Sequence, residues 1–473
     1  MKKPSKSNKQ LWTGRFQKSV SDAVIDYTGS LDVDRRLAPQ DLEGTRAHVQ
    51  MLSSQGILSE SNCESILNAL SQVETEIKEN QFPYRSELED IHMNIESRLI
   101  ELVGPSGAGV HSARSRNDQV SLDIKLYCRE TTNCWKNQLL NLQDSFLDRS
   151  EDLKEELFPA WTHLQVAQPI SWSHYLLSFC VMFARDIERL ESYQIRTSTS
   201  PLGAGAVAGS TLPINPEITA QTLGFKQSFE NSYDVVGNRD FILELLQIAT
   251  QLMIHVSRLA EDFIYMSSSG VGWLRLPESL CTGSSMMPQK QNPDVLELAR
   301  GRAASVLGHT QAVSTLLKGL PTSYHRDLQE DKTHLFATAD IVTSTLRILP
   351  LIILGFQICR DKYTHLFKES FLESTDLAEY LVEQDVPFRE AHRQVGKLVS
   401  YCASKNKALQ ELTDEEIQKW NPKCTKAVLK SLDPKSSLKR RNHRGGTGVK
   451  AVEKQLEHWH NWIKERRKTV SIK

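Results

Sequence analysis

The stretch from Asp240 to Ser269 limits the possible folds more than any other, because it contains neither proline nor glycine. Apolar residues recur along it at spacings of three and four, at Phe241, Leu245, Ile248, Leu252, Val256, Leu259 and Phe263. Leu246, Ala249, Met253 and Ala260 widen the same stripe. An α-helix gathers residues at these spacings on one face. We therefore expect a long helix that is buried on much of its circumference.

The same periodicity predicts further long helices at 119–157, at 171–198, at 295–318, and from Asp331 to near Pro350. Strand patterns are nearly absent, and long helices with wide apolar stripes form bundles. With 473 residues, the chain is too long for one ordinary core. We predict an all-α fold with an N-terminal helical domain (1–112), a central bundle of long helices (113–365) and a small C-terminal helical domain (366–473). Short helices are expected in the last domain, because Pro387, Pro422, Pro434 and Gly445-Gly446 interrupt it.

Composition excludes several classes of protein. Lys and Arg total 57 and Asp and Glu total 58, so the net charge of -1 gives no general attraction to nucleic acid or to a membrane surface. The eight cysteines form no CxxC pair and no zinc spacing, which favours reduced thiols in a cytosolic protein. The N-terminus lacks the apolar stretch of a signal peptide, and the most apolar run, 348–356, is too short to cross a bilayer. We expect a cytoplasmic protein.

Four short stretches interrupt the helical pattern and concentrate polar residues, namely 109–119, 161–174, 283–293 and 321–332. Loops between rigid helices are common places for a functional site. No metal-binding or nucleotide-binding motif is present in the sequence. We therefore expect chemistry from side chains alone, without a cofactor.

The stretch 283–293 contains hydroxyls, amides and one ammonium group, and Gly283, Pro288 and Pro293 prevent a helix there. Such a loop suits a mobile lid over an anionic substrate, in which Lys290 and Asn292 stabilise developing negative charge. An ordinary polar connection is the alternative interpretation.

The other stretches also have two interpretations each. Arg114 and Arg116 precede a long helix and suit a carboxylate site, or they are solvated charges beside a helix cap at Ser115 or Asn117. His163 is a candidate acid or base, or a structural histidine. The segment 324–332 is dense in charge, and its alternative is a solvated linker with internal ion pairs.

Taken together, these stretches match a known family. Residues 283–293 resemble the signature of the fumarase/aspartase superfamily, Gly-Ser-Ser-x-Met-x-x-Lys-x-Asn-Pro. Within that superfamily, residues 114–120, 162–169 and 327–332 resemble the argininosuccinate lyase family. The resemblance extends to Trp12, Gly14, Arg15 and Phe16, and to segments 89–92, 376–392 and 440–447.

The resemblance implies a mainly helical subunit of a homotetramer, in which each active site takes residues from three subunits. It implies a small-molecule substrate, argininosuccinate, from which fumarate is reversibly eliminated to leave arginine. A base removes a proton beside a carboxylate, and the resulting carbanion (an aci-carboxylate) expels the guanidinium nitrogen. No nucleic acid or membrane takes part.

The resemblance also assigns roles to residues. Ser284 corresponds to the general base, His163 to its partner in proton transfer and Glu297 to the carboxylate that orients His163. Thr162 lies beside His163, and Lys290 holds the developing charge together with Asn292. Substrate binding falls to Ser30, Asp34, Arg116, Asn117, Asn292, Tyr324, Gln329 and Lys332.

Several positions depart from the family pattern, namely Ser112-Ala113, Ala204, Gly237-Asn238 and Gln291. None of them removes a proposed catalytic group. Three alternatives stay open at this point: a lyase of another N-substituted aspartate, a non-catalytic structural protein like the delta-crystallins, and a helical scaffold.

Overall fold

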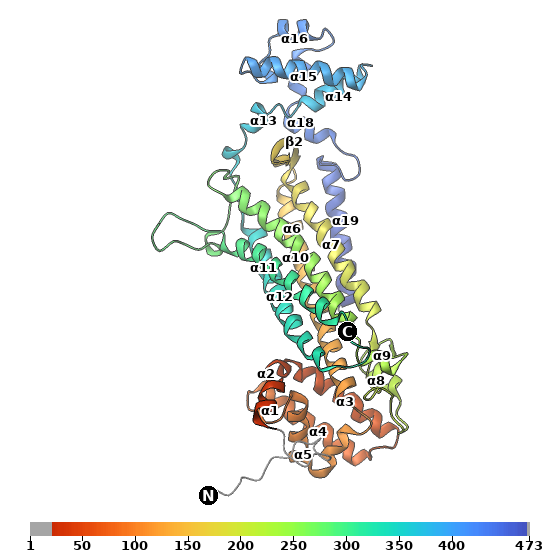
Figure 1. Ribbon diagram of the computed structural model, residues 1–473. Coiled ribbons are helices and arrows are strands. Elements are labelled where there is room, and N and C mark those ends of the chain that lie inside the picture. Colours follow the sequence, from red (N-terminus) through yellow and green to blue (C-terminus); the bar gives the residue numbers. More distant parts are fainter. Residues whose placement is uncertain (1–20, 471–473) are drawn as a thin grey trace. The chain divides into compact units, whose positions relative to one another are not determined.

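The computed structural model describes residues 21–470, which form a mainly helical chain (Figure 1), so the predicted fold class is confirmed. By Cα proximity the chain divides into two compact units. Of the described residues, unit 1 contains 21–133, 189–250 and 305–340, and unit 2 contains 134–188, 251–304 and 341–470. The family-like residues Trp12, Gly14, Arg15 and Phe16 lie outside the described residues. The three-domain division stays a prediction.

Five long helices dominate the middle of the chain. They are α6 (Arg116–Asp152), α7 (Trp172–Arg196), α10 (Asp240–Ser267), α11 (Asp294–Leu317) and α12 (Asp331–Gly355). All five confirm helices that the apolar spacing predicts. Helix α6 ends before the expected Leu157, because Leu157 begins a strand.

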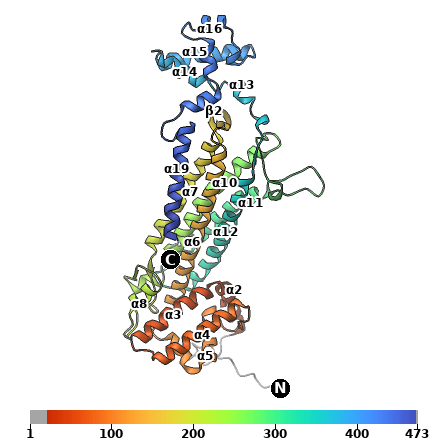
Figure 2. The same cartoon turned by 180° about the vertical axis from the view of Figure 1, so that it is seen from behind.

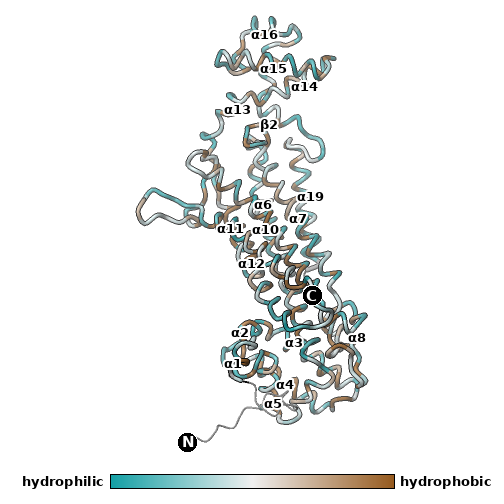
Figure 3. The backbone as a smooth tube through the Cα atoms, viewed as in Figure 1, coloured by the Kyte–Doolittle hydropathy of each residue, from teal (hydrophilic) through white to brown (hydrophobic). Residues whose placement is uncertain are grey.

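The apolar stripe of α10 is buried as its periodicity predicts. The seven residues that define the stripe are each at most 6% exposed. Polar contacts add to this packing in unit 2, where the Tyr175 hydroxyl donates to Asp262 and His255 Nδ1 lies 2.6 Å from Asp186 Oδ2. Figure 3 shows hydrophobic and hydrophilic residues mixed along these helices, as amphipathic packing requires.

Helix α12 continues through Pro350 to Gly355, so the end expected near that proline is wrong. A proline inside a helix costs about 3 kcal/mol, because it removes one backbone hydrogen bond and crowds the preceding turn. Leu346, Leu349, Ile352 and Ile353 are all buried on either side of it. Burial of each contributes roughly 1.5–3 kcal/mol, which together exceeds the cost of the proline.

The N-terminal helices of unit 1 have their own core. Helices α3 (Ala38–Ser54), α4 (Glu60–Lys78) and α5 (Ile91–Val103) bury a cluster that includes Leu42, Val49, Ile66, Leu70, Ile91 and Ile95. Asp90 caps α5 by accepting a hydrogen bond from the Met93 backbone N–H at 2.7 Å. Shorter elements of this unit are α1 (Asp22–Thr28), α2 (Leu31–Asp34), α8 (Pro216–Thr222), α9 (Ser232–Val235), β3 (Thr199–Ser200) and β4 (Gln227–Ser228).

One β-hairpin in unit 2 interrupts the otherwise mainly helical chain. Strand β1 (Leu157–Thr162) pairs with the antiparallel strand β2 (Gln165–Ser171). The two connecting residues, His163 and Leu164, have φ angles of 55° and 57°. Positive φ at both positions is the geometry of a type I′ turn, whose twist matches the paired strands. A second, shorter pair is formed by β5 (Leu274–Arg275) and β6 (Gln357–Ile358).

Short helices follow α12, as expected, but a long one ends the described chain. Helices α13 (Leu366–Glu369), α14 (Ser374–Glu383), α15 (Phe388–Ser404), α16 (Asp414–Trp420), α17 (Lys426–Ser431) and α18 (Pro434–Arg440) precede α19 (Val449–Val470). Leu377, Leu381, Leu398 and Ile417 belong to one core of this region. Helix α19 lies beside α6 and α7 in both views of the chain (Figures 1 and 2), with Arg467 bonded to Asp144.

Among the described residues, one helical stretch, Arg326–Gly355, is long and apolar enough to cross a membrane by length and composition. A core helix of a soluble protein satisfies the same criteria. All eight cysteines are free thiols. Four of the buried ones lie in helices, namely Cys63, Cys128, Cys180 and Cys402.

Candidate active site

The residues that the sequence singles out fall into two groups, one in each unit. Unit 1 contains Ser30, Asp34, Arg116, Asn117, Tyr324, Gln329 and Lys332, and unit 2 contains Thr162, His163, Ser284, Lys290, Asn292 and Glu297.

The start of α6 in unit 1 is fixed by a reciprocal cap. Ser115 Oγ accepts a hydrogen bond from the Asn117 backbone N–H at 3.3 Å, and the Asp118 carboxylate accepts one from the Ser115 N–H at 2.9 Å. The cap expected at Ser115 is therefore confirmed. Asp118 also accepts the N–H groups of Gly203 and Gly205, and burial raises its pKa to about 6.

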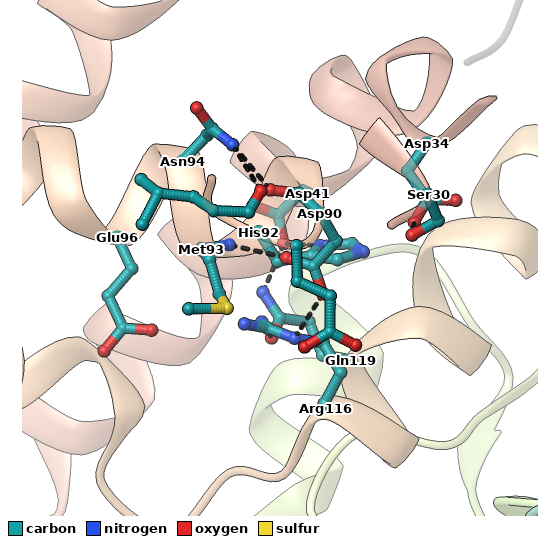
Figure 4. Close-up of polar contacts among 12 residues, drawn as sticks. Ser30, Asp34, Asp41, Asp90, His92, Met93, Asn94, Glu96, Arg116 and Gln119 are labelled. Carbon is teal, nitrogen blue, oxygen red and sulfur yellow. Dashed lines mark hydrogen bonds and ion pairs between the residues drawn. The ribbon is translucent and has the colours of Figure 1, made fainter. Parts of the chain in front are cut away.

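Arg116 begins α6 and is held by two side chains (Figure 4). Its Nε lies 3.0 Å from Asp90 Oδ2, and its Nη1 donates to Gln119 Oε1 at 2.6 Å. Its neighbour Asn117 donates from Nδ2 to the Ala206 carbonyl at 3.1 Å. Arg116 and Asn117, which are expected to bind substrate, are therefore each held in place by contacts with other residues of unit 1.

Gln119 connects this group to a buried cluster of Asp41, His92 and Asp123. Gln119 Nε2 donates to Asp41 Oδ1, and His92 Nδ1 lies 3.1 Å from Asp41 Oδ1 and 3.3 Å from Asp123 Oδ2. Burial acts to raise the pKa of Asp41, but His92 and then Arg114 lower it to about 2. Burial, followed by the charge on Asp41, raises the pKa of Asp123 well above its ordinary value. The two pKa values shift in opposite directions, so Asp41 gives up its proton more readily than Asp123 does.

Asp34 is the centre of a second buried cluster in unit 1. It is 1% exposed, and its Oδ1 lies 2.6 Å from Lys332 Nζ. Ser30 Oγ and Gln329 Nε2 both donate to its Oδ2. Burial alone acts to raise the pKa of Asp34, but the charges of Lys332 and His92 hold it below its ordinary value. The cluster joins three of the predicted binding residues around the carboxylate of a fourth, Asp34.

The segment before α12 places Tyr324 in unit 1. Ser323 has a φ of 73°, and Tyr324 packs against Ala204, Val235 and Val236. Gly237 approaches this segment so closely that a Cβ atom there would lie 2.2 Å from the Ser323 carbonyl oxygen. The departure from the family pattern at Gly237 therefore accompanies a close backbone contact beside Tyr324.

In unit 2, the loop with the superfamily signature lies between η3 (Glu278–Leu280) and α11 (Figure 1). It is non-helical, as its glycine and prolines predict. Two backbone hydrogen bonds between Thr282 and Asn292, of 3.1 and 2.8 Å, close the loop at its base. Lys290, Asn292 and Glu297 line a cleft of ≈ 990 Å³ together with Arg275 and Lys362, whereas Ser284 is not among its lining residues.

Ser284 Oγ accepts hydrogen bonds from two backbone N–H groups of its own loop. The Met286 N–H lies 3.3 Å from it and the Met287 N–H lies 3.1 Å from it. Donors aimed at an oxygen stabilise the deprotonated form of that oxygen. This arrangement supplies part of what a serine needs to act as a base.

Thr162 and His163 are exposed at the end of the hairpin in unit 2. The hairpin is anchored by aromatic packing, because the Trp161 ring lies 4.9 Å from that of Trp273 and 5.6 Å from that of Tyr265. This packing supports the turn that contains His163. Within unit 2, neither His163 nor Thr162 lines the cleft beside Lys290.

Several residues of these clusters were not predicted as site residues. Gln119, Asp41 and Asp123 meet only in the folded chain, and Arg239 forms a buried 2.6 Å ion pair with Asp331, next to Lys332. The signals available were three family-like segments: 89–92, which contains the Arg116 partner Asp90 and the buried His92, 114–120, which contains Gln119, and 327–332, which contains Asp331.

Comparisons with known proteins match most of the chain. A family model described as Lyase matches residues 14–308, and one described as Argininosuccinate lyase C-terminal matches residues 371–439. The argininosuccinate lyase of Symbiobacterium thermophilum is 42% identical over 94% of this chain and 97% of its own length. That of Neisseria gonorrhoeae is 42% identical over 95% of this chain and 98% of its own length.

Among solved structures, EDDS lyase in complex with formate has a TM-score of 0.82 at 22% identity, covering 94% of this chain and 90% of that one. The helical fold and the signature loop together define a lyase of the fumarase/aspartase superfamily. Within it, the extent of the sequence match is decisive: the chain belongs to the argininosuccinate lyase family.

Proposed function

We propose that the chain catalyses the reversible elimination of fumarate from argininosuccinate, leaving arginine. The observation that supports this most is the two-donor environment of Ser284 Oγ in a loop with the complete superfamily signature. Ser284 removes the proton from the carbon beside a substrate carboxylate. The electron pair moves into that carboxylate, where Lys290 and Asn292 stabilise the charge.

The elimination is completed when the pair returns, the C–N bond breaks and the guanidinium nitrogen takes a proton from His163. Glu297 orients His163, and Thr162 contacts the substrate. The three carboxylates of the substrate suit the donors Arg116, Asn117, Asn292, Ser30, Tyr324 and Lys332. Asp34 holds Ser30, Gln329 and Lys332 in place and is the proposed acidic partner of the guanidinium end. No cofactor enters this mechanism.

We also propose a cytoplasmic homotetramer with active sites shared between subunits. Association is supported by exposed apolar side chains on the long helices of unit 2, where Ile254, Leu298, Leu351 and Leu354 are 44–56% exposed. Leu351 and Leu354 lie three residues apart on α12 and so share one helix face, and exposed apolar side chains on a shared face favour association.

The test is fumarate release from argininosuccinate, followed by ultraviolet absorbance, for the parent and for Ser284→Ala. The neighbouring Ser285→Ala is the matched control, because it removes an exposed hydroxyl from the same loop. We expect the parent and S285A to release fumarate at similar rates and S284A to lose about 10²–10⁴ in rate, the usual contribution of a positioned base. Equal rates for all three proteins would show that Ser284 is not the base. No fumarate release from a folded parent would reject the proposed lyase activity.

A further inference from the structure

The amide of Gln119 is buried and lies between two groups of opposite charge. Its Nε2 donates to the Asp41 carboxylate, and its Oε1 accepts from Arg116 Nη1 at 2.6 Å. A carboxylate only accepts hydrogen bonds and a guanidinium only donates them. An amide side chain satisfies both at once, whereas a carboxylate or an ammonium at this position would be repelled by one neighbour.

The amide also determines how the guanidinium of Arg116 is oriented. Asp90 holds Nε at 3.0 Å, and Gln119 holds Nη1. Because the guanidinium is planar and rigid, two held nitrogens fix the third. Within residues 21–470, Nη2 makes no hydrogen bond, so it stays available to a ligand.

Behind Gln119, the Asp41 carboxylate is itself held in place. His92 Nδ1 lies 3.1 Å from Asp41 Oδ1, and Arg114, which donates to Thr45 at 2.8 Å, supplies positive charge nearby. Asp41, His92 and Asp123 are each at most 1% exposed. The amide of Gln119 is therefore bound to an immobile anchor rather than to a surface side chain.

We infer that Gln119 is a positioning residue, whose amide transmits the fixed location of the buried Asp41 carboxylate to the Arg116 guanidinium and so presents Nη2 to a substrate carboxylate. The inference rests on the proposed function in one respect, the binding of a substrate carboxylate by Arg116. Gln119 itself does not contact the reacting atoms in this account.

The experiment measures KM and kcat for argininosuccinate in the parent, Gln119→Leu, Arg116→Gln and the double variant. Gln143→Leu is the matched control, because Gln143 is a fully buried glutamine of unit 2 that donates to the Cys180 carbonyl at 3.3 Å. We expect Q119L to raise KM about tenfold, as weakening a hydrogen bond to a charged group does, with kcat changed much less. The KM of the double variant should equal that of R116Q, because the amide acts only through the arginine.

Two results would overturn the inference: an unchanged KM in Q119L, or effects of Q119L and R116Q that multiply. A fall in thermal stability shared by Q119L and Q143L without a change in KM identifies a merely structural role. Crystal structures of the parent and Q119L give a test that needs no activity. If the Arg116 guanidinium moves away from Asp90 in Q119L, the inference is supported, and if it stays in place, the inference is rejected. This outcome does not depend on whether the parent releases fumarate.

Discussion

At the residue scale, the most informative feature is a pair of buried carboxylates whose pKa values shift in opposite directions. Asp41 and Asp123 share His92 as a neighbour, yet the pKa of Asp41 is lowered to about 2 and that of Asp123 is raised. A charged carboxylate makes ionisation of a buried neighbour more costly, so the charge on Asp41 raises the pKa of Asp123. The donors around Asp41, including Gln119, favour the ionised form of Asp41.

The first prediction separates these two carboxylates. Asp123→Asn replaces the carboxyl whose ionised form burial disfavours with a neutral amide, and it should change the free energy of unfolding at pH 7 by less than about 1 kcal/mol. Asp41→Asn removes the ionised member and should cost about 3–5 kcal/mol, because Arg114 is left without its buried counter-charge. Urea denaturation at pH 7 measures both. Equal losses would contradict the opposite directions of the two pKa shifts.

The pH dependence of this pair follows from the directions of the shifts. The lowered pKa of Asp41 contributes stability that is present above about pH 4 and is lost as the pH falls toward 2. The raised pKa of Asp123 works the other way, because its contribution is lost as the pH rises above its ordinary value. Relative to the parent, D123N should therefore lose less stability between pH 4 and pH 8, as shown by denaturation at a series of pH values.

The second prediction concerns the ion pair of Lys332 and Asp34. Lys332→Met leaves Asp34 buried without its cation, which should cost about 3–5 kcal/mol. Burial then acts without that opposing charge and raises the pKa of Asp34, so the variant should gain stability relative to the parent as the pH falls from 7 to 5. Adding Asp34→Asn to K332M should restore much of the loss. No recovery in the double variant would show that the cost lies elsewhere.

At the scale of elements, the turn of the hairpin contains backbone strain, because His163 and Leu164 both have positive φ angles. Leu164 has a φ of 57°, a region that costs a bulky residue about 1–2 kcal/mol. Its side chain is 62% exposed, so little packing opposes a change. Leu164→Gly should therefore raise the free energy of unfolding by up to about 1 kcal/mol. Leu212→Gly, at an exposed loop leucine without positive φ, should lower it, and a loss in both variants would contradict the turn geometry.

Gly237 is the position at which close backbone contact constrains the segment that contains Tyr324. Gly237→Ala places a Cβ atom 2.2 Å from the Ser323 carbonyl oxygen, so the segment must shift, at a cost of about 1–3 kcal/mol. We expect a higher KM for argininosuccinate in this variant, because Tyr324 moves with the segment. Gly396→Ala is the control, since its Cβ meets nothing within 4 Å in α15, and it should stabilise by about 1 kcal/mol.

Elements differ in how far the sequence predicts them. The five long helices follow from apolar spacing, a local property, and Ser115 follows from the preference of helix caps for serine. The hairpin was missed because its turn lacks an Asn-Gly or Asp-Gly pair and its strands contain Pro159 and Pro169. The pairing of His92 with Asp41 and Asp123 is long-range, so no local pattern predicts it.

At the scale of the whole molecule, the proposed site residues are divided between two units of each chain. Arg116 lies in unit 1 and Ser284 in unit 2. If active sites combine residues of different subunits, as we propose, then a tetramer mixed from Arg116→Gln and Ser284→Ala chains contains some sites with neither change. Co-expression of the two variants should restore a fraction of the parent rate of fumarate release.

The matched control for this mixture combines two changes in the same unit, Ser284→Ala and Lys290→Met, which lie on one loop. Sites in that mixture have a defective loop whichever chain supplies it, so no activity should return. Recovery of activity in the control mixture would argue against shared sites. So would a lack of recovery in the first mixture once its chains are shown to form tetramers.

The pair of backbone hydrogen bonds between Thr282 and Asn292 has a consequence for how the chain responds to proteases. It separates residues 283–291 from the helix that follows, and Met286 within that segment is 87% exposed. Exposed loop tips are preferred points of cleavage. Brief trypsin treatment should therefore cut after Lys290 while the flanking helices stay intact. A bound substrate that draws Lys290 inward should slow this cut, so that the rate of nicking reports the position of the loop.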